Sequence, residues 1–538
     1  MLAASRPETQ IRRMTRFAAR LACALGALGA ALPASAQSAP AGARPSLVVL
    51  ITVDQLRNDY LDRFAGQLSG GLGRLSRQGA WFTNAHQDHA ITETAPGHAT
   101  LLAGRFPRST GIMMNRIGVD DEAAPLIAGG VGPGASPKRF VGTTLVDWMT
   151  AQDRASRALS VSTKDRAAIL PVGRSRAQVY WYSPDGRFTT STYYRDSLPP
   201  WVVAWNHRHF PQSFAGRSWD LLLPETAYPE PDSVAAEGSA GTTFPHLLPD
   251  DPIDAASIVR ATPFIDDITL SFALHGVQSL ALGAGPHTDL LSVSLSATDF
   301  IGHRYGPDSR EIHDQVLRVD RAIGVFLDSL YRLRDSSRVT IVLTSDHGVG
   351  TIPELAPASM KPAPVRVTLS SLMPALRAGL LAAHVDTMAL VFDQPTVFVD
   401  RAAFTKGGAD ADSAIASFAA AVRAVPGVLR VDRFRTLLAD SLTDPIARRW
   451  AHQFPATAPI ELVVTLTPLS TWGGSFASHG SPHDYDSHVP LIFSGAGVRP
   501  GRYPAFVRTV DLAPTLAAIA GVRPLERLDG VVLSAAIR

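Results

Sequence analysis

The chain has 538 residues, of which 46% are hydrophobic and 18% are charged, and its formal net charge at pH 7 is +2. These values are typical of a globular protein with a large core, and they exclude a mainly disordered or low-complexity chain. Residues 1–36 hold five Arg and one Glu, so removing them changes the formal charge to −2 and leaves no charge-based support for a nucleic-acid-binding domain.

The first 36 residues have the pattern of a secretory signal peptide. Arginines precede the apolar run Leu21–Leu32, and small residues ending at Ala36 follow it. This run is shorter than the roughly 20 residues that a membrane-spanning helix needs. We therefore predict export to the periplasm or the medium, cleavage near Ala36, a flexible leader over 37–45 and no membrane span in the mature protein.

Cys23 is the only cysteine and lies within the predicted signal peptide, so the mature protein is expected to contain no disulfide. An exported protein without disulfides depends on its hydrophobic core and on bound metals for stability. The Arg12-Arg13 pair leaves the twin-arginine and the general secretory routes both open.

Three apolar runs, each followed by Asp or His residues, predict central strands of a parallel sheet. The runs are Ser46–Val53 before Asp54, Leu290–Leu295 before Asp299 and His303, and Val339–Thr344 before Asp346 and His347. Ligand and catalytic groups gather beyond the carboxyl ends of such strands. The sequence therefore predicts one site assembled from distant segments.

Two segments are interpreted as insertions forming a cap, one at about 116–285, between the first two runs, and one at about 356–475, after the third. The first is irregular and rich in Gly, Pro and aromatic residues, with a predicted strand pair over Val179–Tyr194. The second contains strand candidates at Thr396–Val399 and Ile460–Leu466.

A helix is also predicted within the second insertion, at Asp412–Val425. The core pattern returns at His479, followed by a predicted strand at Val489–Phe493 and a helix near Leu512–Ile519. Strands alternating with helices predict an α/β fold, with a mainly parallel sheet and helices on both faces, in one catalytic domain over 46–538.

The Asp and His residues after the strands offer the donors that zinc prefers. Asp299 and His303 are four positions apart, so one helical turn places both on the same face. Asp346 and His347 are adjacent in the sequence. On a loop after a strand, they can bind two neighbouring metals or both bind the same metal. The mixture of oxygen and nitrogen donors favours zinc over magnesium or calcium. A single Asp-x-x-x-His is more often a solvated pair or a helix cap, so the zinc interpretation depends on the motifs occurring together.

The segment Thr92–His98 (TETAPGH) is predicted to place Thr94 at a helix N-terminus, with Pro96 in the first turn. A hydroxyl is a useful nucleophile only when a base or a metal activates it. Without such a partner Thr94 would be a simple N-cap.

These motifs together resemble the alkaline phosphatase superfamily, most of all the phosphate-irrepressible bacterial alkaline phosphatases, which are relatives of the nucleotide pyrophosphatase/phosphodiesterases. The resemblance extends from Asp54 to Val510–Thr515 (VDLAPT). It implies that Thr94 is the nucleophile and that Asn115 binds a phosphoryl oxygen. The metal ligands that it implies are Asp54, Thr94, Asp299, His303, Asp346, His347 and His479, holding two Zn²⁺. Because His483 and His488 lie close by in sequence, the last imidazole ligand stays open between His479 and His483.

One further motif separates branches of the superfamily. Thr163–Arg166 looks like the Lys-x-Arg of the phosphate-irrepressible type, which implies that Lys164 and Arg166 bind the phosphoryl group. Taken alone, this motif would be read as a solvated surface turn. The sulfatase branch, which uses a Cys or Ser in a Cys/Ser-x-Pro-x-Arg motif, is disfavoured because the turn at Thr94 ends in His98.

Charge counting within the implied site favours phosphate monoesters as substrates. The charges of two Zn²⁺ are balanced by three aspartates and a Thr94 alkoxide, so Lys164 and Arg166 remain to match a dianion. A diester carries only one negative charge and gains less from two extra cations.

The sequence therefore predicts an exported zinc-dependent alkaline phosphatase that hydrolyses small phosphate monoesters through a phosphothreonine. A phosphodiesterase or nucleotide pyrophosphatase with the same two metals is the alternative enzyme. A zinc-binding pseudoenzyme or a carbohydrate-surface binder is the alternative of a different class. The natural substrate, the oligomeric state and the choice between periplasm and medium stay open.

Overall fold

The fold is that of a computed structural model, which describes residues 44–238, 242–474 and 476–538. The predicted signal peptide and residues 37–43 of the predicted leader lie outside the described residues. Among the described residues, no helix combines the length and the apolar character that crossing a membrane requires.

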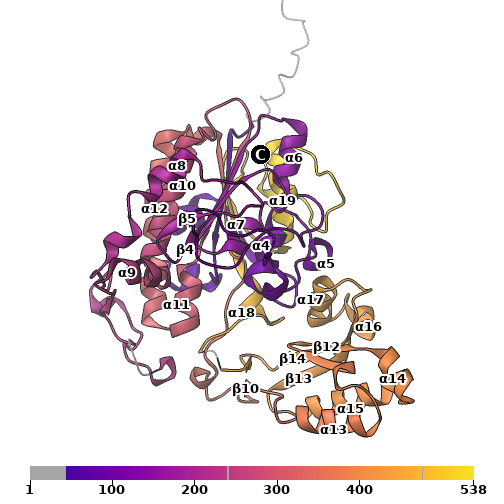
Figure 1. The fold of residues 1–538 in the computed structure, drawn as a ribbon. Coiled ribbons are helices and arrows are strands. Elements are labelled where there is room, and N and C mark those ends of the chain that lie inside the picture. The colour runs from indigo at the N-terminus through magenta and orange to yellow at the C-terminus, as the bar shows by residue number, and fades with distance from the viewer. Residues whose placement is uncertain (1–43, 239–241, 475) are drawn as a thin grey trace, which may run out of the picture. The chain divides into compact units, whose positions relative to one another are not determined.

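A nine-stranded sheet forms the centre of the molecule, in the order β17-β2-β16-β9-β1-β8-β3-β4-β5 (Figure 1). Its strands are β1 (Leu47–Val53), β2 (Ala80–His86), β3 (Ala158–Ser162), β4 (Gln178–Ser183), β5 (Arg187–Thr189), β8 (Asp289–Leu295), β9 (Val339–Thr344), β16 (His488–Gly495) and β17 (Gly501–Arg508). β1 pairs in parallel with β8 and β9, whereas β16 is antiparallel to β9 and β2, and β5 is antiparallel to β4. The prediction of a mainly parallel sheet is confirmed.

Helices cover both faces of this sheet, as predicted, because alternate side chains of a strand point to opposite faces. In β1, Val49 and Ile51 pack into one hydrophobic core and Val48 and Leu50 into the other. The first core includes α3 (Gly71–Gln78), α10 (Phe264–Ser279), α11 (Ala297–Tyr305) and α12 (Arg310–Leu333). The second includes α4 (Thr94–Leu101), α6 (Leu145–Gln152), α7 (Asp165–Ile169) and α19 (Leu512–Ala520). β1 is buried along its whole length, which explains its continuous apolar sequence.

The segment 116–285 contributes three strands to the central sheet, β3, β4 and β5, so much of it belongs to the core rather than to a cap. β4 and β5 pair as a hairpin around Pro184–Gly186, which confirms the predicted strand pair. Outside the sheet the segment forms α8 (Pro200–Asn206), α9 (Pro252–Ile258) and the short strands β6 (Ser218–Trp219) and β7 (His246–Leu247). Its bounds as an insertion stay a prediction.

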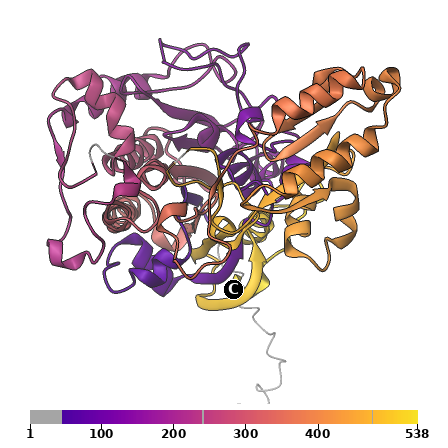
Figure 2. The same cartoon turned by 90° about the horizontal axis from the view of Figure 1, so that it is seen from below.

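The segment 356–475 builds a smaller antiparallel sheet, in the order β11-β12-β14-β13, with a hydrophobic core of its own. The strands are β11 (Leu390–Asp393), β12 (Thr396–Val399), β13 (Val428–Arg433) and β14 (Ile460–Leu466). The helices are α13 (Met373–Ala382), α14 (Arg401–Gly407), α15 (Ala411–Arg423), α16 (Phe434–Leu437) and α17 (Pro445–Gln453). Figure 2 shows these elements in orange. Both predicted strands and the predicted helix of this segment are confirmed.

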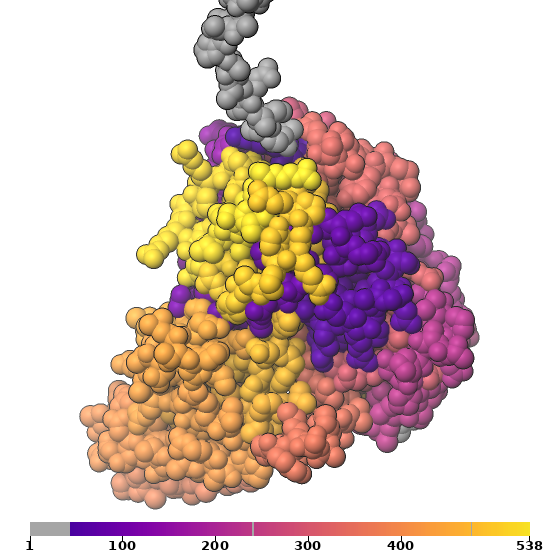
Figure 3. All heavy atoms as spheres, turned by 180° about the vertical axis from the view of Figure 1, so that it is seen from behind, coloured from indigo at the N-terminus to yellow at the C-terminus, as the bar shows by residue number. Residues whose placement is uncertain are grey.

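The remaining α-helices and strands of the described residues are short. They are α2 (Asp59–Arg63), α5 (Pro107–Thr110), α18 (Asp484–Ser487), β10 (Arg366–Val367) and β15 (Thr471–Trp472). β17, close to the C-terminus of the chain, pairs in parallel with β2 from the N-terminal part. Figure 3, which shows the molecule from behind, has yellow C-terminal residues beside indigo N-terminal residues.

Candidate active site

The predicted site residues converge at one edge of the central sheet, where the parallel strands β9, β1, β8 and β3 end. Each of these strands is followed directly by one part of the site. The parts are Asp346 and His347 after β9, Asp54 after β1, Asp299 and His303 on α11 after β8, and Lys164 after β3. Neighbouring parallel strands bring their carboxyl ends together, and this explains how residues far apart in the chain share one place.

Thr94 is the first residue of α4, with Pro96 in the first turn, as predicted. Its side chain is almost fully buried, and its Oγ1 lies 3.4 Å from Nε2 of His347. Gly97 permits this arrangement, because a Cβ at position 97 would lie 2.3 Å from the main-chain oxygen of Asp346. Because Thr94 is the first residue of α4, its hydroxyl lies at the positive end of the helix dipole.

The three histidines of the site are all oriented by main-chain carbonyl groups. The bonds are from His303 Nδ1 to Ala477 O at 3.0 Å, from His347 Nδ1 to Gly348 O at 2.9 Å, and from His479 Nδ1 to Thr92 O at 2.7 Å. A carbonyl oxygen only accepts hydrogen bonds, so each neutral ring carries its proton on Nδ1 and a lone pair on Nε2. Such outer hydrogen bonds are typical of histidines that bind a metal.

Asp299, His303 and His479 form a group whose chemistry fits a cation. Nε2 of His303 and Nε2 of His479 are 3.2 Å apart, and Oδ1 of Asp299 lies 3.3 Å and 3.8 Å from them. Two lone pairs and a carboxylate oxygen at these distances repel one another unless a positive charge lies between them. The nitrogen and oxygen donors suit zinc.

A second group contains Asp54, Asp299 and His347, whose donor atoms lie within 4.8 Å of one another. Asp346 belongs to the same group, because its Oδ2 lies 3.5 Å from Nε2 of His347. Oδ1 of Asp54 is fully buried and accepts no hydrogen bond from the described residues. A buried carboxylate oxygen without a donor is costly, and a metal ion would satisfy it.

Lys164 lies among these carboxylates. Its Nζ is 2.6 Å from Oδ2 of Asp54 and 2.5 Å from Oδ2 of Asp299. Burial favours the neutral amine, but the charges of Asp299 and Asp54 outweigh it and raise the pKa of Lys164 above its ordinary value. Burial, Asp299 and Asp346 hold the pKa of Asp54 well above its ordinary value. One ammonium does not balance three buried carboxylates, so the site fits further positive charge.

Asn115 stands beside Thr94 and is held by two hydrogen bonds. The main-chain N–H of Ala95 donates to Oδ1 of Asn115 at 2.8 Å, and the N–H of Asn115 donates to Oε2 of Glu93 at 2.6 Å. Because Oδ1 is the acceptor, the Nδ2 group is the part of the amide that remains to donate to a ligand.

Arg166 lies near the N-terminus of α7, two residues after Lys164. Its side chain is 30% exposed, and Nη1 lies 3.7 Å from Oδ1 of Asp165. Its Nε is buried and has no hydrogen-bond partner among the described residues. The guanidinium therefore retains donors for an anionic ligand.

The structure brings His479, and not His483 or His488, to the group with Asp299 and His303. His483 donates from Nε2 to the carbonyl of Leu466 at 2.8 Å, and His488 donates from Nε2 to the carbonyl of Thr83 at 2.9 Å.

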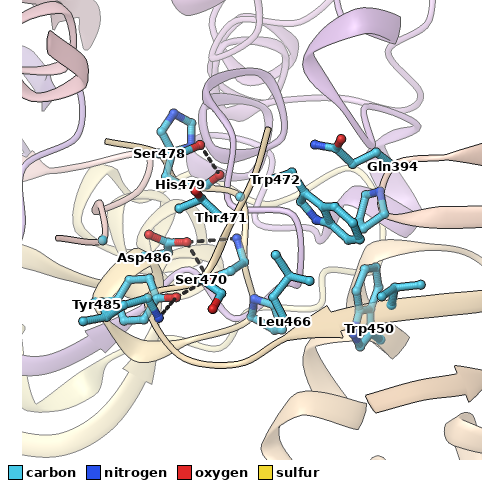
Figure 4. Close-up of a pocket in the computed structure, with 17 residues that line it drawn as sticks. Gln394, Trp450, Leu466, Ser470, Thr471, Trp472, Ser478, His479, Tyr485 and Asp486 are labelled. Carbon is cyan, nitrogen blue, oxygen red and sulfur yellow. Dashed lines mark hydrogen bonds between the residues drawn. The ribbon is translucent and has the colours of Figure 1, made fainter. Parts of the chain in front are cut away.

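The loop that carries His479 is braced by Asp486. Its Oδ2 accepts from the N–H of Ser481 at 2.9 Å and from its hydroxyl at 2.6 Å (Figure 4). Burial raises the pKa of Asp486 to about 7. A cavity of about 60 Å³, lined in part by Trp472 and Gln394, separates this loop from the smaller sheet.

Gln55 is a site residue that the sequence reasoning missed. Its main-chain N–H donates to Oδ1 of Asp346 at 3.2 Å, and its Nε2 donates to Oδ1 of Asp299 at 2.9 Å. Gly302 leaves room for it, because a Cβ at position 302 would lie 1.9 Å from Oε1 of Gln55. Its position directly after Asp54 is the only signal in the sequence, and nothing there identifies its partners.

Gln453, the last residue of α17 in the segment 356–475, was also missed. Its Oε1 accepts from the N–H of Ile91 at 2.8 Å, and its Nε2 donates to the carbonyl of Met113 at 2.5 Å. It thereby ties together the segments that lead to Thr94 and Asn115. No local pattern marks this residue, because its role depends entirely on tertiary contacts.

Comparisons with known proteins agree on one family. The sequence profile of the type I phosphodiesterase / nucleotide pyrophosphatase family matches residues 48–372. Alkaline phosphatase PafA of Elizabethkingia meningoseptica is 30% identical over 522 residues, which cover 92% of this chain and 95% of that protein. Alkaline phosphatase PhoK of Sphingomonas sp is 31% identical over 518 residues, covering 90% of each chain. The crystal structure of wild-type PafA matches with a TM-score of 0.83 at 27% identity, over 92% of this chain and 99% of that chain.

Proposed function

Because this chain belongs to the type I phosphodiesterase / nucleotide pyrophosphatase family, we propose that it is a zinc-dependent alkaline phosphatase acting on phosphate monoesters. The observation that carries this proposal is the Thr94 hydroxyl, which lies at a helix N-terminus beside two groups of metal-ligating side chains. The names of the relatives PafA and PhoK, both alkaline phosphatases, support the monoester assignment.

Two zinc ions are part of this proposal. Asp299, His303 and His479 would hold one, and Asp54, Asp346 and His347 the other, with Thr94 adjacent. When bound, they supply Lewis acidity, which lowers the pKa of a hydroxyl and neutralises charge on the leaving oxygen.

Hydrolysis would then take place in two steps at Thr94. Oγ1 of Thr94 loses its proton and forms a bond to phosphorus as the ester bond from phosphorus to the leaving oxygen breaks, and the leaving oxygen takes up a proton in exchange. Water next attacks the phosphothreonine, which releases inorganic phosphate and restores the hydroxyl. Each step inverts the configuration at phosphorus, so the proposal predicts overall retention.

The chain's own residues orient and stabilise the phosphoryl group. Nδ2 of Asn115 would donate to one equatorial oxygen, since Ala95 already occupies Oδ1. Arg166 would donate from its guanidinium, and Lys164 would add a second positive charge. The N-terminus of α4 favours the negative charge that develops beside Thr94.

A phosphodiesterase or nucleotide pyrophosphatase is the second candidate, and the description of the matching family profile favours it. Two cations near the phosphoryl position favour a monoester dianion over a diester monoanion. We also propose export to the periplasm or the medium, on the basis of the signal-peptide pattern in residues 1–36.

Replacing Arg166 or Lys164 by Ala tests the preference for monoesters. We expect Arg166→Ala to lower kcat/KM for p-nitrophenyl phosphate by about 10- to 100-fold, the value of a charge-assisted hydrogen bond. Lys164→Ala is expected to lower it by a similar factor, because it removes the second positive charge beside the phosphoryl group. For bis(p-nitrophenyl) phosphate the loss in either variant should be several-fold smaller.

Arg208→Ala is the matched control, since Arg208 is an arginine whose guanidinium packs on Trp205, outside the site. It should leave both rates unchanged. Equal losses on the monoester and the diester in Arg166→Ala would show that these cations do not select monoesters.

A further inference from the structure

A second cavity, of about 310 Å³, lies next to Lys164 and Arg166. We call it the Arg260 cavity, and its principal lining residues are Lys164, Arg166, Trp181, Arg260 and Phe300. Its volume is in the range of sites for small organic ligands. Lys164 and Arg166 belong both to this cavity and to the proposed phosphoryl site, so a group attached to the phosphoryl lies within reach of the cavity.

More cationic than acidic side chains line the cavity. Lys164, Arg166 and Arg260 line it, and Asp165 is the only acidic residue among its lining. Lys164 is matched by Asp54 and Asp299, and Arg166 lies 3.7 Å from Asp165. Within the described part of the chain, Arg260 forms no ion pair and no hydrogen bond to a carboxylate. A cation without an acidic partner here favours an anionic ligand group.

Phe300 gives the cavity an aromatic face near Lys164 and Arg260. Nζ of Lys164 lies 5.2 Å from the ring centroid, and Cζ of Arg260 lies 6.0 Å from it. Phe300 follows Asp299 on α11, and Arg260 lies in the 3₁₀ helix η5 (Val259–Ala261), which contacts α11. The ring therefore lies within cation–π distance of both Lys164, at the phosphoryl side of the site, and Arg260.

We propose that the Arg260 cavity receives the leaving group of the substrate and selects phosphate monoesters whose leaving group carries a second negative charge. Arg260 is then the residue that determines this specificity. A small planar or aliphatic group would rest on Phe300, and its distal carboxylate or phosphate would bind the guanidinium. This inference rests on the proposed phosphatase function and names the substrate class of the same site.

The test compares three aryl phosphates on the zinc-loaded full-length protein. They are 4-carboxyphenyl phosphate, its uncharged analogue 4-carbamoylphenyl phosphate, and 1,4-phenylene bisphosphate. We expect kcat/KM for the carboxylate to exceed that for the amide by about tenfold, and the preference to shrink at high salt. The bisphosphate, after a statistical correction for its two ends, tells whether a distal phosphate binds better than a carboxylate.

In Arg260→Ala the preference for the carboxylate over the amide should fall to about onefold, because the rate on the carboxylate should drop more than the rate on the amide. Arg260→Lys should retain part of the preference, and Arg208→Ala should retain all of it. Active wild-type enzyme with no preference for either anionic substrate, or an undiminished preference in Arg260→Ala, would overturn the cavity proposal alone. Failure of the wild-type enzyme on all three substrates would overturn the proposed function itself.

Discussion

Thr94→Ala is expected to abolish turnover of phosphate monoesters while both zinc ions remain bound. The substitution removes the only hydroxyl at the N-terminus of α4 and leaves the groups around Asp299 and Asp54 unchanged. Loss of a covalent nucleophile typically lowers kcat by several orders of magnitude, so we expect a decrease of at least about 10⁴-fold. The measurement is the rate on p-nitrophenyl phosphate together with the zinc content of the purified protein.

Thr94→Ser is the control for this experiment, because it keeps a hydroxyl in the same place and should retain measurable activity. Acid quenching of the wild-type enzyme during turnover should also trap a phosphorylated peptide that contains Thr94. Near-normal activity of Thr94→Ala with its zinc content intact would show that another group attacks phosphorus.

Asp299→Asn is expected to remove zinc as well as activity. Asp299 lies in both groups of candidate ligands, and its Oδ2 accepts from Lys164. A neutral amide has one acceptor oxygen instead of two and would place an N–H₂ group against the ammonium or the metal. We expect activity to fall by at least about 10³-fold, with fewer than two zinc ions per chain by elemental analysis.

Asp266→Asn is a matched control, because Asp266 is a fully buried carboxylate outside the proposed ligand set. Burial raises the pKa of Asp266 to about 7, and its two oxygens accept from Ala297 N–H and Gln315 Nε2, so the oxygen of Asn keeps one of these two bonds. This variant should keep zinc and activity. If Asp299→Asn kept two zinc ions and most of its activity, Asp299 would not be a ligand.

The central strands could be predicted because a strand whose two faces are both buried has a continuous apolar sequence. The predicted Val339–Thr344 coincides with β9, and the predicted Thr396–Val399 coincides with β12. Asp or His residues directly after such runs then indicated where a site would form, since the ends of parallel strands meet at one edge.

Other features depend on tertiary contacts that leave no local pattern. β3 (ALSVS) is short and carries two serines, so neither its length nor its composition identifies it as a central strand. The bonds of Gln453 to Ile91 and Met113 join segments separated by hundreds of residues. The position of Lys164 between Asp54 and Asp299 likewise requires β3 to lie beside β8, which the sequence does not show.

The most direct test of the central claim is the ratio of kcat/KM for p-nitrophenyl phosphate to that for bis(p-nitrophenyl) phosphate, measured on zinc-loaded wild-type protein. With Lys164 and Arg166 each contributing a charge-assisted contact to a dianion, the monoester should be favoured by about 100-fold. Chelated protein should lose both activities and regain them with zinc. A diester hydrolysed faster than the monoester, or activity that survives complete removal of metal, would contradict the account.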